Sequence, residues 1–438
     1  MLTAFYQAFR TPDLRKKLLF TLFIIVIFRL GASLPTPGVN EHSVISCLNT
    51  AHSSLLGLVN LLSGGALLKL TVFALGIMPY ITASIILQLL AVVIPRLEAL
   101  RQEGPSGTAK ITQYTRYLTI GLAILQSTAV VALAENPSQL FGTNCATSLL
   151  TNQKVFTIAT MVICLTAGTA VIMWLGELIT DRGVGNGMSL MIFTQVIAVV
   201  PGQLYTVLQN EHVFIFALVL AVGVLIIGAV AFMEQAQRRI PVQYAKRMVG
   251  RKMYGGTSTY IPLKVNQAGV IPVIFASSLL TIPVLAANLF GNTNSTTGQA
   301  SGWASWIQQR LVRGDDPYYM VGFFILIILF TYFYVSITFN PDEVADNMKK
   351  SGGFIPGIRP GGPTAGYLRF VLNRLTAPGS IYLGVVALIP MIAIGLVSAG
   401  NQFPLGGTSI LIAVGVGLDT VKQIESQLQQ RNYEGFLR

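Results

Sequence analysis

Apolar residues gather along this chain in long runs that are interrupted by charged residues, Gly and Pro. A helix of about 20 mostly apolar residues spans the hydrocarbon core of a bilayer. Ten runs approach that length, and we predict a membrane-spanning helix over each of them: Leu18–Leu34, Thr71–Ile94, Tyr117–Ala134, Val155–Ile179, Met188–Leu208, Val213–Met233, Gln267–Phe290, Pro317–Phe339, Ser380–Val397 and Leu405–Thr420. This pattern predicts an all-α integral membrane protein with ten transmembrane helices.

The composition supports the same class of protein. Hydrophobic residues make up 53% and charged residues 11% of the 438 positions, whereas charged residues make up roughly a quarter of an ordinary soluble domain. So much apolar surface exceeds what the core of one water-soluble domain buries. The composition therefore excludes a soluble enzyme.

The distribution of Lys and Arg predicts the orientation in the membrane. With the N-terminus placed in the cytoplasm, 24 of the 29 basic residues fall in cytoplasmic segments, and Lys154, Arg310 and Arg313 fall outside. Cytoplasmic loops of membrane proteins carry an excess of positive charge of this kind. We therefore expect both termini to be cytoplasmic.

The order of the spans predicts two halves. Five spans precede residue 210 and five follow it, which predicts pseudo-symmetric halves over residues 1–210 and 211–438. Membrane channels and transporters are often built from such structural repeats. No residue-level repeat accompanies the symmetry, so this prediction rests on hydropathy alone.

One short segment, residues 60–70 (NLLSGGALLKL), interrupts the pattern directly before the second span. It is too short to cross a bilayer alone and too apolar for a solvated loop. Irregular backbone at membrane depth is tolerated where it is packed in protein or lines a watery cavity. Two structures remain open at this point: a re-entrant half-helix, or a short amphipathic helix on the outer membrane surface.

Two long cytoplasmic segments, residues 234–264 and 340–377, mix Lys and Arg with Tyr, Pro and Gly. Gly and Pro in the second segment predict an ordered, hairpin-like loop. Basic residues among such turns can dock acidic or phosphate-rich partners. Alternatively, these charges only fix the orientation of the spans in the membrane. That role explains the length of the two segments less well.

The spans carry little chemistry of the kind that catalysis needs. They offer no pair of carboxylates for acid–base catalysis, and His42, His52 and His212 fall in outer loops without metal-ligand spacing. The chain has no P-loop motif, and we interpret the glycines of residues 183–187 as a tight turn between helices. Arg29 and Glu177 fall toward the ends of their spans, where they can snorkel. A charge-poor interior argues against ion coupling and predicts a passage with an inert wall.

The positions of the three cysteines leave it open whether the chain contains a disulfide. Cys47 and Cys145 are both expected on the outer side of the membrane, and Cys164 lies in the fourth span. The first two could form a disulfide or remain two separate thiols, and the second arrangement is favoured because they lie in different loops.

Several long motifs, in one order along nearly the whole chain, resemble the bacterial SecY family, the pore-forming subunits of the Sec protein translocon. The motifs are Leu62-Ser-Gly-Gly-Ala66, Ala74-Leu-Gly-Ile-Met-Pro79, Ile111-Thr-Gln-Tyr-Thr-Arg116, Trp174-Leu-Gly-Glu177, Arg182-Gly-Val-Gly-Asn186, Tyr244-Ala-Lys-Arg247, Ala345-Asp-Asn-Met-Lys-Lys350 and Pro356-Gly-Ile-Arg359. The resemblance implies an hourglass channel of two five-helix halves, closed outside by a plug. It also implies a lateral opening between spans two/three and seven/eight.

The resemblance assigns residues to each part of the channel. A narrow apolar ring would comprise Ile77, Ile81, Met188, Ile192, Ile274 and Ile412, where the family usually has isoleucine and Met188 is a conservative departure. The plug would comprise Leu62, Ser63, Gly64, Gly65, Ala66, Leu67, Leu68, Lys69 and Leu70. The motor ATPase SecA and the ribosome would dock on Arg238, Arg239, Lys246, Arg247, Arg251, Lys252, Lys349, Lys350 and Arg359.

The resulting hypothesis is a passive channel for unfolded secretory chains, without a cofactor, in the bacterial cell membrane. The resemblance implies SecE and SecG as further subunits, SecA or the ribosome as the driving partner, and signal peptides and nascent chains as ligands. A secondary transporter with ten spans and a broken helix is the alternative. A membrane enzyme is a distant third, because catalytic groups are lacking.

Overall fold

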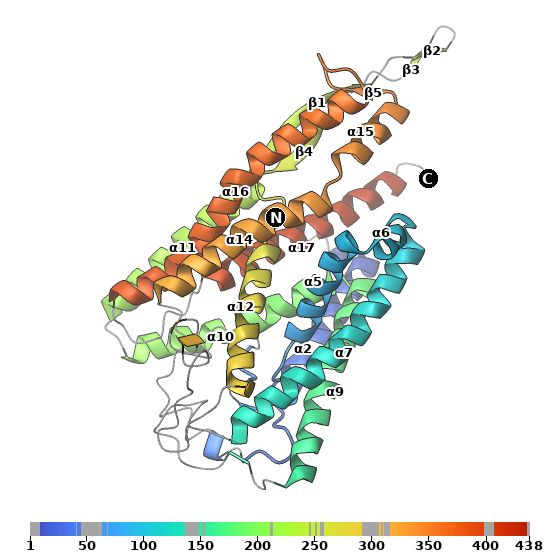
Figure 1. Ribbon diagram of the computed structural model, residues 1–438. Helices are drawn as coiled ribbons and strands as arrows, with labels where there is room; N and C mark the ends of the chain where they lie inside the picture. The colour runs from blue at the N-terminus through green and yellow to red at the C-terminus, as the bar shows by residue number, and fades with distance from the viewer. Residues whose placement is uncertain are drawn as a thin grey trace.

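The computed structural model describes residues 9–40, 42–44, 64–67, 69–135, 149–150, 154–210, 213–244, 247–249, 252–254, 258–290, 306–307, 310, 316–397 and 407–435. Ten long helices dominate it (Figure 1): α2 (Pro12–Gly31), α5 (Met78–Val93), α7 (Pro105–Glu135), α9 (Val155–Arg182), α10 (Gly187–Asn210), α11 (Val213–Gln235), α12 (Ile271–Phe290), α14 (Pro317–Thr338), α16 (Gly362–Val397) and α17 (Gly407–Gly435). Each predicted span overlaps one of these helices.

Length and hydropathy alone select fewer of these helices as spans. Within the described residues, four ranges are long and apolar enough to cross a membrane: Pro105–Ala132, Val155–Arg182, Pro317–Lys350 and Gly362–Ile389. Helix α5 and the short α6 (Pro95–Gln102) make a fifth if the pair is one span, although the two are bent by 105°. The bend follows from Pro95, because a residue before proline favours extended backbone and Ile94 has ψ 111°. The count of ten spans stays a prediction.

Three helices extend well beyond the predicted spans. Helix α7 begins at Pro105 rather than Tyr117, α16 begins at Gly362 rather than Ser380, and α17 continues from Thr420 to Gly435. Hydropathy marks the part of a helix that suits lipid, whereas the backbone hydrogen bonds of a helix can continue into water. The predicted bounds were therefore too short at these ends.

The helices pack in two groups that meet along a few surfaces. In the first group α7 contacts α5 and α9, and α9 contacts α2 and α10. In the second group α14 contacts α12 and α16, and α17 contacts α11 and α16. The groups meet where α12 contacts α5 and α7 and where α10 contacts α17 (Figure 1). The division into halves at residue 210 stays a prediction, with which this grouping is consistent.

The exterior of the helices suits lipid. On α2, the side chains of Leu22, Phe23 and Leu30 are 57%, 60% and 62% exposed. Large apolar side chains are also exposed on α9, α11 and α14, among them Ile163, Phe232 and Ile325. Exposed apolar surface on this scale is expected of a multi-pass membrane protein.

The two basic segments contain β-strands that were not predicted from the sequence. Strand β1 (Gln237–Tyr244) pairs antiparallel with β4 (Ser258–Lys264), and β5 (Gly353–Phe354), from the second basic segment, pairs with the other edge of β1. Strands β2 (Arg247–Val249) and β3 (Lys252–Tyr254) form a separate hairpin. Figure 1 shows these strands at one end of the molecule, beside α15 (Pro341–Lys350). The all-α prediction thus holds for the helices in the membrane, while the basic segments form a small sheet.

The second basic segment is ordered, as its Gly and Pro predict. Helix α15 has Pro341 in its first turn, and the Asn340 side chain caps it by accepting a hydrogen bond from the amide of Asp342 at 3.2 Å. Residues 351–361 then turn back through β5 to the start of α16. The predicted hairpin-like course of this segment is therefore confirmed.

Candidate functional site

The six predicted ring residues gather in one apolar cluster inside the molecule. Five of them are 7% exposed or less: Ile77, Ile81, Ile192, Ile274 and Ile412. Met188 is partly buried and packs against the same cluster. These residues come from the start of α5 and from α10, α12 and α17, so both groups of helices contribute to the cluster.

Local geometry places the two isoleucines of the second predicted span. Ile77 is the N-cap residue of α5, and the amide of Ile81 donates to its carbonyl at 3.1 Å. The fixed φ of Pro79 suits the first turn of a helix, so α5 begins here rather than at Thr71. Side chains four residues apart share a helix face, which puts Ile77 and Ile81 on one side of this start.

Met188 is held at the first turn of α10 by a close approach of α9. A Cβ atom on Gly176 would lie 2.6 Å from the Met188 sulfur, so any larger residue at this position would require the thioether to move. The flexible methionine side chain fills the irregular space between the two helices. Among the six ring residues, Met188 is the partly exposed one.

The turn between α9 and α10 confirms one interpretation of the sequence. Helix α9 ends at Arg182 and α10 begins at Gly187. Asn186 Oδ1 accepts a hydrogen bond from the amide of Met188 at 3.1 Å and caps the new helix. A Cβ atom on Gly187 would lie 1.8 Å from the Gly176 carbonyl oxygen, which requires glycine there. The glycine-rich run is a tight interhelical turn and not a phosphate loop.

The predicted plug is only partly described, since Leu62, Ser63 and Leu68 lie outside the described residues. Gly64, Gly65, Ala66, Leu67, Lys69 and Leu70 form turns rather than a regular helix. Ala66, Leu67 and Leu70 are 1%, 6% and 2% exposed. Three of the described side chains are therefore buried while Lys69 is exposed, and the re-entrant half-helix stays a prediction, since the described backbone forms turns.

Hydrogen bonds tie this segment to the rest of the fold. The Leu70 carbonyl accepts hydrogen bonds from both the amide and the hydroxyl of Thr36, and the amides of Leu70 and Thr71 donate to the carbonyls of Leu67 and Ala66. Leu70 has φ +48°, a left-handed conformation that is uncommon for a residue with a side chain. Hydrogen bonds thus hold the C-terminal end of the segment, where Leu70 adopts this uncommon backbone conformation.

Two apolar clusters meet at the same segment. Ala66 belongs to the cluster that holds the ring residues. Leu67 and Leu70 belong to a second cluster, with side chains of α7 and α9 such as Val131 and Leu165. The segment therefore bridges the ring cluster and the packing of α7 and α9.

One ion pair links α7 and α9. Both side-chain oxygens of Glu177 on α9 face Arg116 on α7, at 2.8 Å from Nε and 2.7 Å from Nη2. A two-pronged pair of this kind fixes geometry as well as charge. From the sequence, Glu177 was predicted to lie near a span end, where it can snorkel. Its pairing with Arg116 was not predicted, because 61 residues separate the two.

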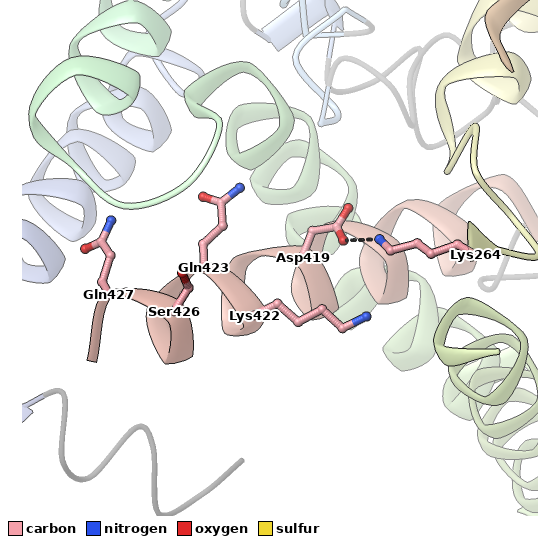
Figure 2. A pocket seen from close by; sticks show the side chains of 6 residues that line it. All are labelled: Lys264, Asp419, Lys422, Gln423, Ser426 and Gln427. Carbon is pink, nitrogen blue, oxygen red and sulfur yellow. Dashed lines mark hydrogen bonds and ion pairs between the residues drawn. The ribbon is translucent and has the colours of Figure 1, made fainter. Parts of the chain in front are cut away.

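A polar cavity of about 640 Å³ lies on the cytoplasmic side of the predicted topology, against the last strand of the sheet and the polar part of α17. Figure 2 shows its lining: Lys264, Asp419, Lys422, Gln423, Ser426 and Gln427. Lys264 Nζ lies 3.2 Å from Asp419 Oδ1. Ile412 of the ring cluster precedes Asp419 by seven residues on the same helix, a rise of about 10 Å. Along α17 the surroundings therefore change from apolar to polar over that distance.

The predicted docking residues lie on the sheet and around α15, where the structure describes them. Five of them are exposed: Arg238, Arg239, Lys349, Lys350 and Arg359. Arg247 and Lys252 lie in the β2–β3 hairpin, whereas Lys246 and Arg251 lie outside the described residues. Pairing of β5 with β1 brings the two basic segments together on one side of the molecule.

Some of these charges also stabilise the fold. Arg239 lies over the Tyr260 ring, with 4.8 Å between its guanidinium carbon and the ring centroid. Lys349 and Lys350 lie in the last turn of α15, where positive charge interacts favourably with the helix dipole. Arg359 is exposed in the turn before α16, and its carbonyl accepts a hydrogen bond from the Thr364 hydroxyl at 2.9 Å. Arg359, like Arg238, is thus a described docking candidate whose exposed side chain has no hydrogen bond or ion pair among the described residues.

Comparison with known proteins decides the family. The family model described as SecY matches residues 71–421. The chain belongs to the SecY family. It is 63% identical over 446 residues to the protein translocase subunit SecY of Streptomyces galbus, and 58% identical over 444 residues to that of Mycobacterium tuberculosis, with 100% of each chain covered.

Solved structures support the fold at much lower sequence identity. A protein-conducting channel aligns with a TM-score of 0.60 at 19% identity, over 94% of this chain and 91% of that one. Sec61 in the canine ribosome–channel complex aligns with a TM-score of 0.56 at 17% identity, over the same shares. Membership of the SecY family confirms the predictions of a multi-pass membrane protein, a protein translocase subunit and a non-enzymatic function.

Proposed function

We propose that this SecY-family chain forms the passage of a translocon in the bacterial cell membrane. It passes unfolded secretory polypeptides outward and releases hydrophobic segments sideways into lipid. The gathering of Ile77, Ile81, Ile192, Ile274, Ile412 and Met188 in one interior cluster, drawn from four helices, carries this proposal. The polar cavity beside α17 would be the cytoplasmic approach to that waist.

The chemistry of the waist explains how it would seal and conduct. Branched apolar side chains offer water and ions no hydrogen bonds, so a constriction lined by them dewets. The same side chains can yield around a passing peptide without binding it. The turns at residues 64–67 and 69–70 would add a plug next to this ring.

The contact of α12 with α5 and α7 is the proposed lateral gate. A substrate run of about ten Leu- or Ile-like residues gains roughly 3–6 kcal/mol on entering lipid, while one central charge costs about 2.5–3.5 kcal/mol. The substrate's own sequence therefore decides between lipid and passage. A signal peptide opens the gate if it binds the open state better than the closed one.

A passive channel needs an external source of energy. The exposed basic residues Arg238, Arg239, Lys349, Lys350 and Arg359 are proposed to dock SecA or the ribosome, with SecE and SecG completing the complex. Sec61 and Ssh1, two channels of the same fold, are bound to ribosomes in their solved structures. Contacts with ribosomal RNA would weaken steeply with added salt. The excess of basic residues in the segments predicted to be cytoplasmic supports an orientation with both termini inside the cell.

A secondary transporter remains the second candidate, because the irregular turns before α5 and the 105° bend after it form the broken helix that such proteins use. Vesicles reconstituted with the chain, SecE and SecG separate the two. We expect SecA and ATP to move a secretory precursor into protease protection only when its signal peptide is present. Uptake of small solutes along a sodium or proton gradient, without SecA or ribosomes, would instead favour the transporter.

A further inference from the structure

Gln195 on α10 carries a buried side-chain amide. Gln195 is 0% exposed, and among the described residues neither Oε1 nor Nε2 has a hydrogen-bond partner. Buried polar side-chain atoms nearly always have a hydrogen bond, so an orphaned amide calls for an explanation. Its neighbours on the helix, Ile192 and Val196, belong to the apolar cluster that holds the ring.

Gly64, the first residue of the turns at residues 64–67, lies directly against this residue. A Cβ atom on Gly64 would be 3.2 Å from both the Cα atom and the carbonyl oxygen of Gln195, and 3.4 Å from its Cβ atom. Gly64 also has φ +68°, which glycine adopts without strain. The glycine therefore lets the segment pack closely against the backbone and the Cβ atom of Gln195 at this point.

Gln195 also lies next to the proposed ring. It follows Ile192 by three residues, and residues three or four apart on a helix are neighbours on one face. The face of α10 that carries Met188 and Ile192 therefore continues into a polar residue where the segment sits. An apolar side chain at this position would leave no hydrogen-bonding group unsatisfied.

We propose that Gln195 is a gating residue that holds the closed channel close to opening. An unsatisfied buried amide disfavours the state that buries it, which here is the described structure, with Gly64 packed against Gln195. When the segment leaves, the amide can meet a peptide group of the passing chain, whose N–H and C=O match its acceptor and donor. This inference rests on the proposed channel function and adds a residue that sets the threshold of opening.

Substitution of Gln195 tests the inference in the purified complex with SecE and SecG. Gln195→Leu removes the amide at similar volume, and we expect the resting open fraction in planar bilayers to fall about tenfold, which corresponds to about 1.4 kcal/mol. SecA-driven translocation of a precursor with a weakened signal peptide should fall by a similar factor. A precursor with a strong signal peptide should be transported nearly as by the wild type.

Gln209→Leu is the matched control, because it makes the same change on α10 at an exposed residue whose amide donates to the Tyr205 hydroxyl. We expect it to leave the open fraction unchanged, and Gln195→Met serves as a second variant if Gln195→Leu does not assemble. An open fraction that is unchanged or raised in the Gln195 variants overturns the inference, as an amide satisfied by a trapped water would give. A wild-type complex that fails to translocate overturns the proposed function and this inference together.

Discussion

Arg359→Glu is expected to reduce SecA-driven translocation by about 100-fold or more while the complex still assembles. The side chain of Arg359 is exposed, and no hydrogen bond or ion pair of its guanidinium is seen among the described residues. Reversing a charge at a docking surface replaces an attraction by a repulsion, and losing one partner of a close pair costs about 2–5 kcal/mol. A loss of 100-fold corresponds to about 2.8 kcal/mol. Translocation into vesicles measures the effect.

Lys154→Glu provides the control for net charge. Lys154 is also exposed, but it precedes α9 at the end predicted to lie outside the cell. The same change of two charges there should leave translocation near the wild-type rate. Normal translocation by Arg359→Glu, with SecE and SecG still bound, would show that this residue does not dock the motor.

Replacing Ile81 and Ile192 together by Ser is expected to raise the resting ion conductance about tenfold. Two hydroxyls in the constriction would give water hydrogen bonds that the isoleucines do not offer, so the waist would wet more often. Tenfold requires a reduction of only about 1.4 kcal/mol in the barrier to ions. Current across a planar bilayer, without SecA or substrate, measures the leak.

The matched control makes the same Ile-to-Ser changes at two exposed positions outside the ring. Ile163 and Ile325 are 68% and 56% exposed, on the lipid side of α9 and α14. Ile163→Ser with Ile325→Ser should leave the resting conductance unchanged. Large-to-small changes in a core cost about 2–5 kcal/mol, so the amount of assembled complex is compared first. An unchanged current in an intact Ile81/Ile192 variant would count against these residues as the seal.

Much of the helical framework could be predicted from the sequence, because lipid requires long apolar runs and each predicted run overlaps one helix. The turn at residues 183–186 was predictable as well, since closely spaced glycines permit the approach that Gly187 makes to Gly176. The hairpin of β1 and β4 was missed. Its one signal was the alternation of Ile240 and Val242, which are buried at two-residue spacing between exposed neighbours.

The residues of the candidate site could not be predicted from the sequence pattern alone, because they are defined by contacts between distant parts of the chain. By spacing alone Ile81 and Ile274 are ordinary span residues, and only the resemblance to SecY singled them out. The pairing of Arg116 with Glu177 depends on how α7 packs against α9. The orphaned amide of Gln195 likewise becomes visible only when residues 64–67 are seen to pack against α10.

Crosslinking of a stalled secretory chain tests the apolar waist most directly. Cysteine is placed at position 81 or 192 after Cys47, Cys145 and Cys164 are replaced by Ser, and a thiol-reactive probe is placed in a hydrophilic stretch of the stalled chain. We expect strong crosslinks at both positions and weak ones at position 163, which lies on the exposed face of α9. Crosslinks at position 163 without any at 81 or 192 would contradict the proposed waist.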